Sequence, residues 1–327
     1  MDFGRTNSGL RQKLLRSLLF ASACLLLGAA AALAWLRWES AQPLEAHWRA
    51  RHGELVETGH DIEARPNGLQ VENIRVRSDS GLVASFQVLR RGAISRRMPV
   101  LVILGGQETG GEAVHLFEEA GPRAVVAIDY PYDGSRDFKG VVGFVRNLPA
   151  MRQACRDTPA AVGLTLDWLV SQDWVDPDRI VLAGVSFGVP FAAAAAAGDS
   201  RVGGLILAHG AADNQAWAVA TAERHLPAFV AGPVGTFVNW LGYGPAYDTA
   251  SYVRRVAPRP ILVVGAREDE RTPAGQTEIL FDAASPNRLL RWTDGRHVQV
   301  SRRDVVEQLM DILQREMPFL TGGGDPD

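Results

Sequence analysis

Residues 179–198 read RIVLAGVSFGVPFAAAAAAG, and this stretch decides the fold. Its first five residues are mostly aliphatic, as in a buried strand, and its last residues form an alanine-rich helical run. Between them, Gly184, Ser186 and Gly188 fit the pattern G-x-S-x-G. In this context a serine lies on a strained strand-to-helix turn, and the glycines are needed because side chains there would clash. The stretch therefore predicts a nucleophilic serine between a strand and a helix; the alternative is a purely structural glycine-rich turn.

Strand and helix patterns alternate on both sides of this turn. Before residue 90 the polar and apolar residues alternate and are broken by turn sequences, which predicts an antiparallel meander. The later strands are continuous apolar runs, which are typical of a buried parallel sheet. We expect an α/β fold with a mostly parallel sheet, N-terminal antiparallel strands and helices on both faces. The predicted strands are Glu54–Ile62, Gln70–Arg77, Leu82–Leu89, Val100–Leu104, Ala124–Ile128, Arg179–Ala183, Gly204–Leu207, Pro260–Val264 and Arg288–Trp292, and the predicted helices are Gly110–Ala120, Asn147–Gln172, Phe187–Ala197 and Arg302–Met317.

One segment, residues 214–257, interrupts this alternation. It contains no clear strand, is rich in aromatic residues and is broken by Gly and Pro. An insertion of this length between strands is uncommon and is often functional, for example as a lid over a site. Extra helical packing explains the same residues equally well, so both interpretations stay open.

A serine nucleophile needs a base, and the base needs an acid that orients it. His297 follows the last predicted strand and precedes the closing helix, so it lies at the same sheet edge as Ser186. Of the other histidines, His209 also ends a strand and can line the site without being the base. The loop after the fifth parallel strand carries an acidic cluster, in which Asp269 is the preferred acid and Glu268 the second choice. Asp294, three residues before the histidine, is a third candidate.

These features together resemble the α/β-hydrolase fold superfamily over roughly residues 70–317, and within it the dienelactone-hydrolase-like and peptidase-like serine hydrolases. The chain order Ser186…Asp269…His297 is that of this fold. Further segments resemble its turns after the first two parallel strands, before the serine strand and at the acid: Leu104–Gln107, Asp129–Gly134, Asp176–Ile180 and Asp269–Pro273.

The resemblance implies a Ser-His-Asp triad that works through an acyl-enzyme without a metal or an organic cofactor. It also implies an oxyanion hole made by two backbone N–H groups. One belongs to Phe187, and the other comes from the first βα loop, at Gln107 or Gly106. The sequence departs from the pattern at Gly105, where the superfamily usually has a histidine, which leaves the second donor open.

The predicted activity is hydrolysis of a small-molecule carboxylic ester, as by a carboxylesterase. A thioesterase or a peptidase would use the same residues, because fold and triad do not fix the substrate. A dehalogenase is disfavoured, since it would carry a nucleophilic Asp at position 186. A non-catalytic hydrolase-fold protein that acts as a membrane-tethered binding module is the remaining alternative.

Composition sets further limits on the function. The chain has 327 residues, 46% of them hydrophobic, and a net charge of −3, which gives no reason to expect nucleic-acid binding. Its two cysteines, Cys24 and Cys155, are too few for a disulfide scaffold or a Cys-based zinc site. We expect Cys155 to be buried and unreactive. The oligomeric state is left open.

The first 53 residues form a separate region. Residues 17–36 are uncharged and long enough to span a bilayer, with basic residues before them and Trp35 and Trp38 at the far boundary. The charge bias predicts a single-pass anchor with residues 1–16 in the cytoplasm and the catalytic domain outside, as in a bacterial inner membrane facing the periplasm. A secreted protein is the alternative, cleaved at Ala32–Ala34; a lipoprotein at Cys24 is less favoured. The predicted layout continues with a linker or short helix at 37–53, the hydrolase domain at 54–320 and a disordered tail at 321–327.

Overall fold

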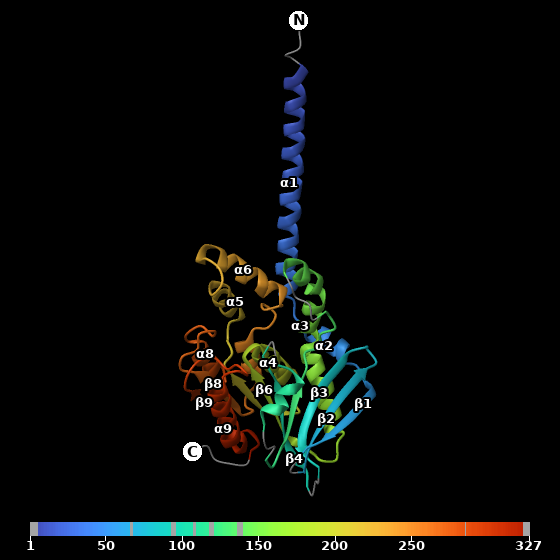
Figure 1. The fold of residues 1–327 in the computed structure, drawn as a ribbon, viewed down its shortest axis with the longest axis vertical. Coiled ribbons are helices and arrows are strands. Elements are labelled where there is room, and N and C mark those ends of the chain that lie inside the picture. Colours follow the sequence, from blue (N-terminus) through green and yellow to red (C-terminus); the bar gives the residue numbers. More distant parts are fainter. Residues whose placement is uncertain are drawn as a thin grey trace.

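The computed structural model describes residues 6–65, 68–92, 96–106, 109–117, 121–135, 140–284 and 286–322, and for residues 6–12 and 141 it describes only the backbone. A long helix projects from a domain built around one twisted sheet (Figure 1). The sheet has the order β1-β2-β3-β5-β4-β6-β7-β8-β9. Its strands are β1 (Leu55–Ala64), β2 (Leu69–Ser78), β3 (Val83–Arg91), β4 (Met98–Leu104), β5 (Ala124–Ile128), β6 (Val175–Val185), β7 (Val202–Ala208), β8 (Ile261–Ala266) and β9 (Arg288–Thr293).

The direction of the strands follows the sequence patterns. The alternating segments β1, β2 and β3 pair antiparallel, and β3 joins β5 in the same sense. The continuous apolar strands β5, β4, β6, β7, β8 and β9 pair parallel. The predicted α/β-hydrolase architecture is therefore confirmed. Because parallel strands end at one edge of a sheet, the loops that follow β4, β6, β7, β8 and β9 all meet there.

Helices cover both faces of the sheet. One apolar core lies between the sheet and α3 (Gly140–Val170), α4 (Val189–Gly198), α7 (Thr249–Val256) and α8 (Gln276–Ala283). The second lies beneath the 3₁₀ helix η2 (Gly111–Leu116) and α9 (Arg303–Leu320). The sequence predicted a helix over residues 110–120. The structure has only the short 3₁₀ helix η2 in the part of this range that it describes, and residues 118–120 lie outside the description. Helix α8 was not predicted, and α3 begins at Gly140 rather than at Asn147.

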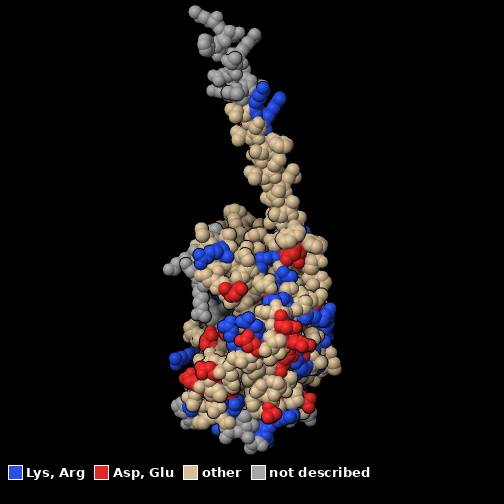
Figure 2. Space-filling model, turned by 90° about the vertical axis from the view of Figure 1, so that its right-hand side faces the viewer, with Lys and Arg blue, Asp and Glu red and all other residues tan. Residues whose placement is uncertain are grey.

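The region before the domain consists of two helices. Helix α1 (Thr6–Ser40) is continuous, and from Lys13 to Ser40 it is long and apolar enough to cross a membrane. On the face drawn in Figure 2 it shows basic side chains near its start and only uncharged residues from there to its foot. The predicted linker contains helix α2 (Glu45–His52), whose Trp48 stacks on Tyr247 with ring centroids 5.8 Å apart. Of the predicted tail, residues 323–327 lie outside the description.

Residues 214–257 contain no strand, as predicted, and form α5 (Asn214–Glu223), α6 (Ala228–Leu241) and α7. The three helices do not share one role. Helix α7 packs on α4 and buries Tyr252, Val253 and Val256 in the core. Helices α5 and α6 pack on each other and cover the sheet edge where the loops meet. In this insertion, α5 and α6 thus form a cap over the sheet edge, and α7 is part of the core packing.

Candidate active site

Ser186 lies on a sharp turn between β6 and α4, where a short 3₁₀ helix, η3 (Ser186–Gly188), connects them. Its φ angle is 54°, in the left-handed region that non-glycine residues rarely adopt. Such strain persists where the surrounding structure forces it, and at a strand-to-helix turn it lifts the serine hydroxyl above the sheet. The turn also places the serine at the positive end of the α4 dipole.

The two glycines beside this turn are required by close backbone contacts. A Cβ atom on Gly188 would lie 2.2 Å from the carbonyl oxygen of Leu104, and one on Gly184 would lie 2.8 Å from Cα of Val189. Neither contact can be relieved by rotating a side chain, since both partners are backbone atoms. The spacing G-x-S-x-G therefore has a steric cause here.

His297 lies within hydrogen-bond distance of the serine. The two atoms, Oγ of Ser186 and Nε2 of His297, are 2.7 Å apart, although the residues are 111 positions apart in the chain. The imidazole is fully buried and comes from the loop after β9. This geometry lets the ring accept the hydroxyl proton when Nε2 is unprotonated.

The carboxylate of Asp269 contacts the other ring nitrogen of this imidazole. Its oxygens lie 2.9 and 3.0 Å from Nδ1 of His297. Its Oδ1 also accepts the backbone N–H groups of Arg271 and Thr272, each at 2.8 Å. Burial alone would raise the pKa of Asp269, but the histidine and these N–H groups lower it, so the carboxylate stays ionised.

The two other acids considered from the sequence lie elsewhere. Glu268 is exposed, and Asp294 is exposed and pairs with Arg267 at 2.9 Å. A residue that sequence reasoning missed, Glu270, contacts the histidine instead. Its Oε2 accepts the backbone N–H of His297 at 3.0 Å. Its place in the same acidic cluster was the only signal for it.

His209 lies behind His297, with ring centroids 5.7 Å apart. Its Nδ1 accepts the backbone N–H of Val298 at 2.9 Å, and its Nε2 is 3.0 Å from Oγ1 of Thr293. Burial, followed by the nearby His297, lowers the pKa of His209 to about 4, so it is neutral near pH 7. It lines the site and supports the loop that carries His297, which fits the sequence expectation that it is not the base.

His209, Asp269 and His297 also offer ligand atoms within 4.8 Å of one another, the only such group among the described residues. The ring nitrogens of both histidines are already engaged, in contacts with Ser186, Asp269, Val298 and Thr293. A metal ion would have to break this chain of contacts. The arrangement therefore fits proton transfer better than metal ligation.

The predicted oxyanion donors are only partly described. Phe187 follows the serine, and its ring packs on Tyr130, Phe191 and Trp217. Gly106 lies beside the serine, since a Cβ atom built on it would be 3.9 Å from Cβ of Ser186. Gln107 lies outside the described residues.

The structure also explains the departure at Gly105. A Cβ atom at this position would lie 2.7 Å from the carbonyl oxygen of Thr109. A histidine here, as is usual in the superfamily, would require the loop to change its path. Tyr130 donates a hydrogen bond from Oη to the carbonyl of Gly105 at 2.7 Å, which holds that path.

A cavity of about 240 Å³ opens beside Ser186. It lies between α3, α4, α5 and α6 and is lined mainly by apolar side chains, including Phe144, Leu148, Met151, Phe191, Trp217 and Val238. Cys155 belongs to its wall, and burial raises the pKa of this thiol to about 12, consistent with an unreactive cysteine. A larger polar hollow of about 880 Å³ lies near β2, β3 and the loop after β5, but Ser186 does not line it. The apolar cavity is therefore the candidate substrate pocket.

Comparisons with known proteins bear on the fold and on the general class of protein. Residues 160–314, which include Ser186, Asp269 and His297, match the model of the prolyl oligopeptidase family. No curated protein matched in a sequence search. The structure resembles an acetyl xylan esterase from Paenibacillus sp. R4, with a TM-score of 0.62 and 16% identity over 86% of this chain and 99% of that one.

Two further structures agree with that result. An acetyl xylan esterase from Thermoanaerobacterium sp. JW/SL YS485 matches with a TM-score of 0.59 and 16% identity, over 88% of this chain and 98% of its own. A 2,6-dihydroxy-pseudo-oxynicotine hydrolase matches with a TM-score of 0.57 and 18% identity, over 78% of this chain and 70% of its own. The chain therefore has the α/β-hydrolase fold and resembles the peptidase-like serine hydrolases within it. Together with this fold, the match of residues 160–314 to the prolyl oligopeptidase family supports a serine hydrolase.

Proposed function

We propose that this serine hydrolase is a membrane-anchored carboxylesterase whose triad is Ser186, His297 and Asp269. The observation that carries the proposal is the continuous contact from Ser186 through His297 to Asp269, at 2.7 and 2.9 Å, beside an apolar cavity. Each group has the partner that its step requires. The three residues come from loops after β6, β9 and β8.

The reaction begins with attack of Oγ of Ser186 on the ester carbonyl carbon, while Nε2 of His297 takes the hydroxyl proton. Asp269 keeps the proton on Nδ1 and stabilises the imidazolium. The N–H of Phe187 and one N–H of the loop after β4 hold the oxyanion; losing one such donor typically costs about 10²–10³ in rate. The imidazolium then protonates the leaving alcohol, and the acyl group stays on the serine. Water, deprotonated by the same imidazole, releases the acid and restores the serine.

A peptidase is the second candidate, because residues 160–314 match the prolyl oligopeptidase family. The acetyl xylan esterases, in contrast, match over nearly their whole length. A panel of p-nitrophenyl esters and peptide p-nitroanilides separates the two candidates. We expect the esters to be cleaved and the anilides to remain intact.

The enzyme proposal is tested by labelling the folded, full-length protein with a fluorophosphonate. We expect the wild type and a Ser301→Ala control to label, since Ser301 is exposed and close in sequence to His297. Ser186→Ala should not label. A wild type that stays unlabelled would contradict the proposal.

We further propose that α1 is retained as an anchor. Its last turn is bound to the domain: Ser40 accepts the N–H of Ala246 at 3.1 Å, and Glu39 accepts the hydroxyl of Tyr243 at 2.6 Å. The charge bias around residues 17–36 favours a catalytic domain outside the cytoplasm. Protease digestion of intact spheroplasts tests this orientation: the domain should be cleaved from outside, and its protection would contradict the proposal.

A further inference from the structure

Helix α6 buries a polar side chain, Asn239, and turns large apolar side chains outward. Asn239 is buried and donates to Oε1 of Gln215 at 2.9 Å, while Gln215 donates to Thr236 at 2.7 Å. In contrast, Phe229 is 83% exposed and Phe237 is 39% exposed. The helix contains no Asp, Glu, Lys or Arg between Ala228 and Leu241. A helix bordering water normally shows the opposite arrangement.

The first turns of α3 also expose large apolar side chains. Val142 and Val145 are 81% and 58% exposed, and Phe144 is 37% exposed. Together with α6, these turns hold more than half of the exposed large apolar side chains that the structure describes outside α1. Clustered exposed apolar residues of this kind mark an interaction surface. We call α6 and residues 142–145 the apolar end.

The apolar end lies beside the foot of α1, at the end of the domain from which α1 projects (Figure 1). Helix α1 packs against α6, and Arg152 of α3 binds both Glu39 of α1 and the carbonyl oxygen of Leu241 in α6. Trp35 and Trp38, about 60% exposed, lie on the last turns of α1. Tryptophans are enriched at the level of lipid headgroups.

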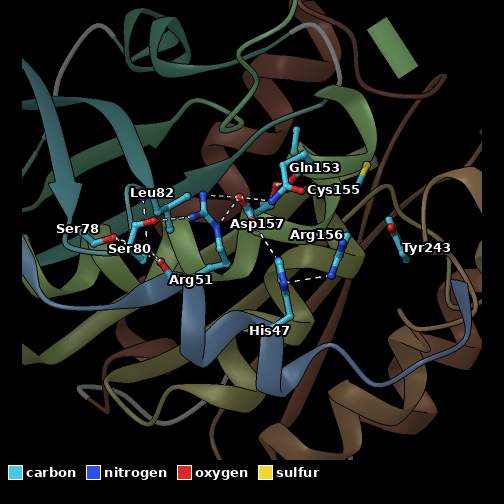
Figure 3. Close-up of polar contacts among 12 residues, drawn as sticks. His47, Arg51, Ser78, Ser80, Leu82, Gln153, Cys155, Arg156, Asp157 and Tyr243 are labelled. Carbon is cyan, nitrogen blue, oxygen red and sulfur yellow. Dashed lines mark hydrogen bonds and ion pairs between the residues drawn. The ribbon is translucent and has the colours of Figure 1, made fainter. Parts of the chain in front are cut away.

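The linker that follows α1 is also fixed to the domain. His47 and Arg51 of α2 contact the buried carboxylate of Asp157 in α3 at 2.7 and 3.0 Å (Figure 3). The linker between α1 and the domain is therefore held in place and is not flexible. The orientation of the domain relative to α1 brings the apolar end to the bilayer that α1 would cross.

From these observations we infer that the apolar end rests in the lipid surface that α1 crosses, and that the pocket takes esters dissolved in that bilayer. The inference rests on the proposed function. The occupant is the membrane itself, because the apolar end is continuous with the helix that spans it. An aliphatic or aromatic group of a lipid-soluble ester is the chemistry that this pocket fits.

The pocket connects the nucleophile with this end. Ser186 lines it, and so do the part-exposed side chains of Phe144 and Val238, which belong to the apolar end. At about 240 Å³ it is slightly smaller than the pockets that enclose whole drug-sized ligands. It therefore holds one apolar portion of the substrate at Ser186, while the remainder extends toward the lipid.

Fluorescence quenching tests the membrane contact without using the enzyme's activity. A Cys24→Ser background would carry Val142→Cys or Phe229→Cys, labelled with an environment-sensitive dye, in phosphatidylcholine vesicles containing nitroxide-labelled acyl chains. Val170→Cys is the matched control, since Val170 is 39% exposed at the opposite end of α3, about 42 Å away at 1.5 Å per residue. We expect several-fold stronger quenching at 142 and 229 than at 170. Equal quenching at all three positions would overturn the inference.

This test also separates the inference from the proposed function. Ser186→Ala carrying the same dye should be quenched as strongly as its parent. If the serine proved inert toward fluorophosphonate while the quenching persisted, only the proposed function would fail. If labelling succeeded without quenching, only the membrane contact would fail.

Activity tests the substrate class. The double variant Phe229→Asp with Phe237→Asp changes outward residues that do not line the pocket. We expect it to hydrolyse a long-chain ester embedded in vesicles at least about 10-fold more slowly, and dissolved p-nitrophenyl acetate within about 2-fold of wild type. Unchanged rates on both substrates, or an equal fall on both, would overturn the inference.

Discussion

The backbone N–H of His297 donates a 3.0 Å hydrogen bond to Oε2 of Glu270. Arg302 completes the contact, because its guanidinium binds the carbonyl oxygen of His297 at 2.6 Å and Oε1 of Glu270 at 2.8 Å. The histidine that faces Ser186 is thus fixed through its backbone as well as through its ring. Glu270 acts as a positioning residue and does not touch the serine.

Glu270→Gln should lower kcat by about 10-fold and remove a pH-dependent part of the stability. Burial alone would raise the pKa of Glu270, but the hydrogen bonds from Arg302 and the His297 N–H lower it to about 2. A pKa lowered on folding stabilises the protein above the unfolded value, near 4.5, and this contribution is lost as pH falls toward about 2. Thermal unfolding in detergent at pH 7 and pH 3 measures it, and the wild type should exceed the variant in stability by more at pH 7 than at pH 3. A difference that grows at low pH would contradict this account, and Glu268→Gln is the control.

Asp269→Asn should lower kcat by about 10⁴-fold while the fold persists. Oδ1 of Asp269 accepts two backbone N–H groups, so the new amide would keep its oxygen there and turn its NH₂ toward His297. The ring would then carry its proton on Nε2 and could not accept the serine hydroxyl proton. Steady-state kinetics on a p-nitrophenyl ester measure the loss. Asp294→Asn, at the exposed third candidate, should stay within 2-fold; a larger loss there would reassign the acid.

Gly188→Ala should prevent stable folding of the turn, because its Cβ would meet backbone oxygens at 2.2 and 2.8 Å. We expect a loss of several kcal/mol or failure to accumulate as folded protein. Gly198→Ala, at the end of α4, is the matched control, since nothing lies within 4 Å of its new Cβ. The melting temperatures of the two variants decide the point. Similar melting temperatures would show that the glycine at 188 is not sterically required.

The core of the site was predictable because its signals are local. The strand, the turn at Ser186 and the helix α4 follow one another directly along the chain, from Val175 to Gly198 in the structure. Parallel pairing then brings the loops after β8 and β9 to the same edge. The positions of Asp269 and His297 follow from strand order, without knowledge of any side-chain contact.

Other features depend on contacts between distant segments. Asp157 meets His47 across 110 positions, and no local pattern indicates that pairing. Asn239 of α6 is buried because it binds Gln215 of α5, a contact that the sequence of α6 does not indicate. Helix α3 was predicted to start late, because its first turns contain two glycines and apolar residues that face outward rather than a polar outer face.

Ala218→Phe should shorten the acyl chain that the pocket accepts. Ala218 is buried in the wall of the cavity, so a larger side chain takes up part of its volume. We expect kcat/KM on p-nitrophenyl octanoate to fall at least about 10-fold relative to the acetate. Ala216→Phe, on the same helix but not lining the cavity, is the control. An equal fall on both esters in Ala218→Phe would mean that the cavity does not hold the acyl group.

Asp157→Asn should loosen α2 from the domain. The carboxylate is 3% exposed and carries the contacts with His47, Arg51 and, at 2.8 Å, Gln153 (Figure 3). Removing its charge leaves Arg51 without its ionic partner, so α2 loses part of what holds it to α3. Hydrogen exchange should therefore accelerate in α2 but not in α4. Asp282→Asn is the control, because that side chain is 78% exposed and its pair with Arg288 contributes little. Unchanged protection of α2 would mean that Trp48, stacked on Tyr247, holds the helix by itself.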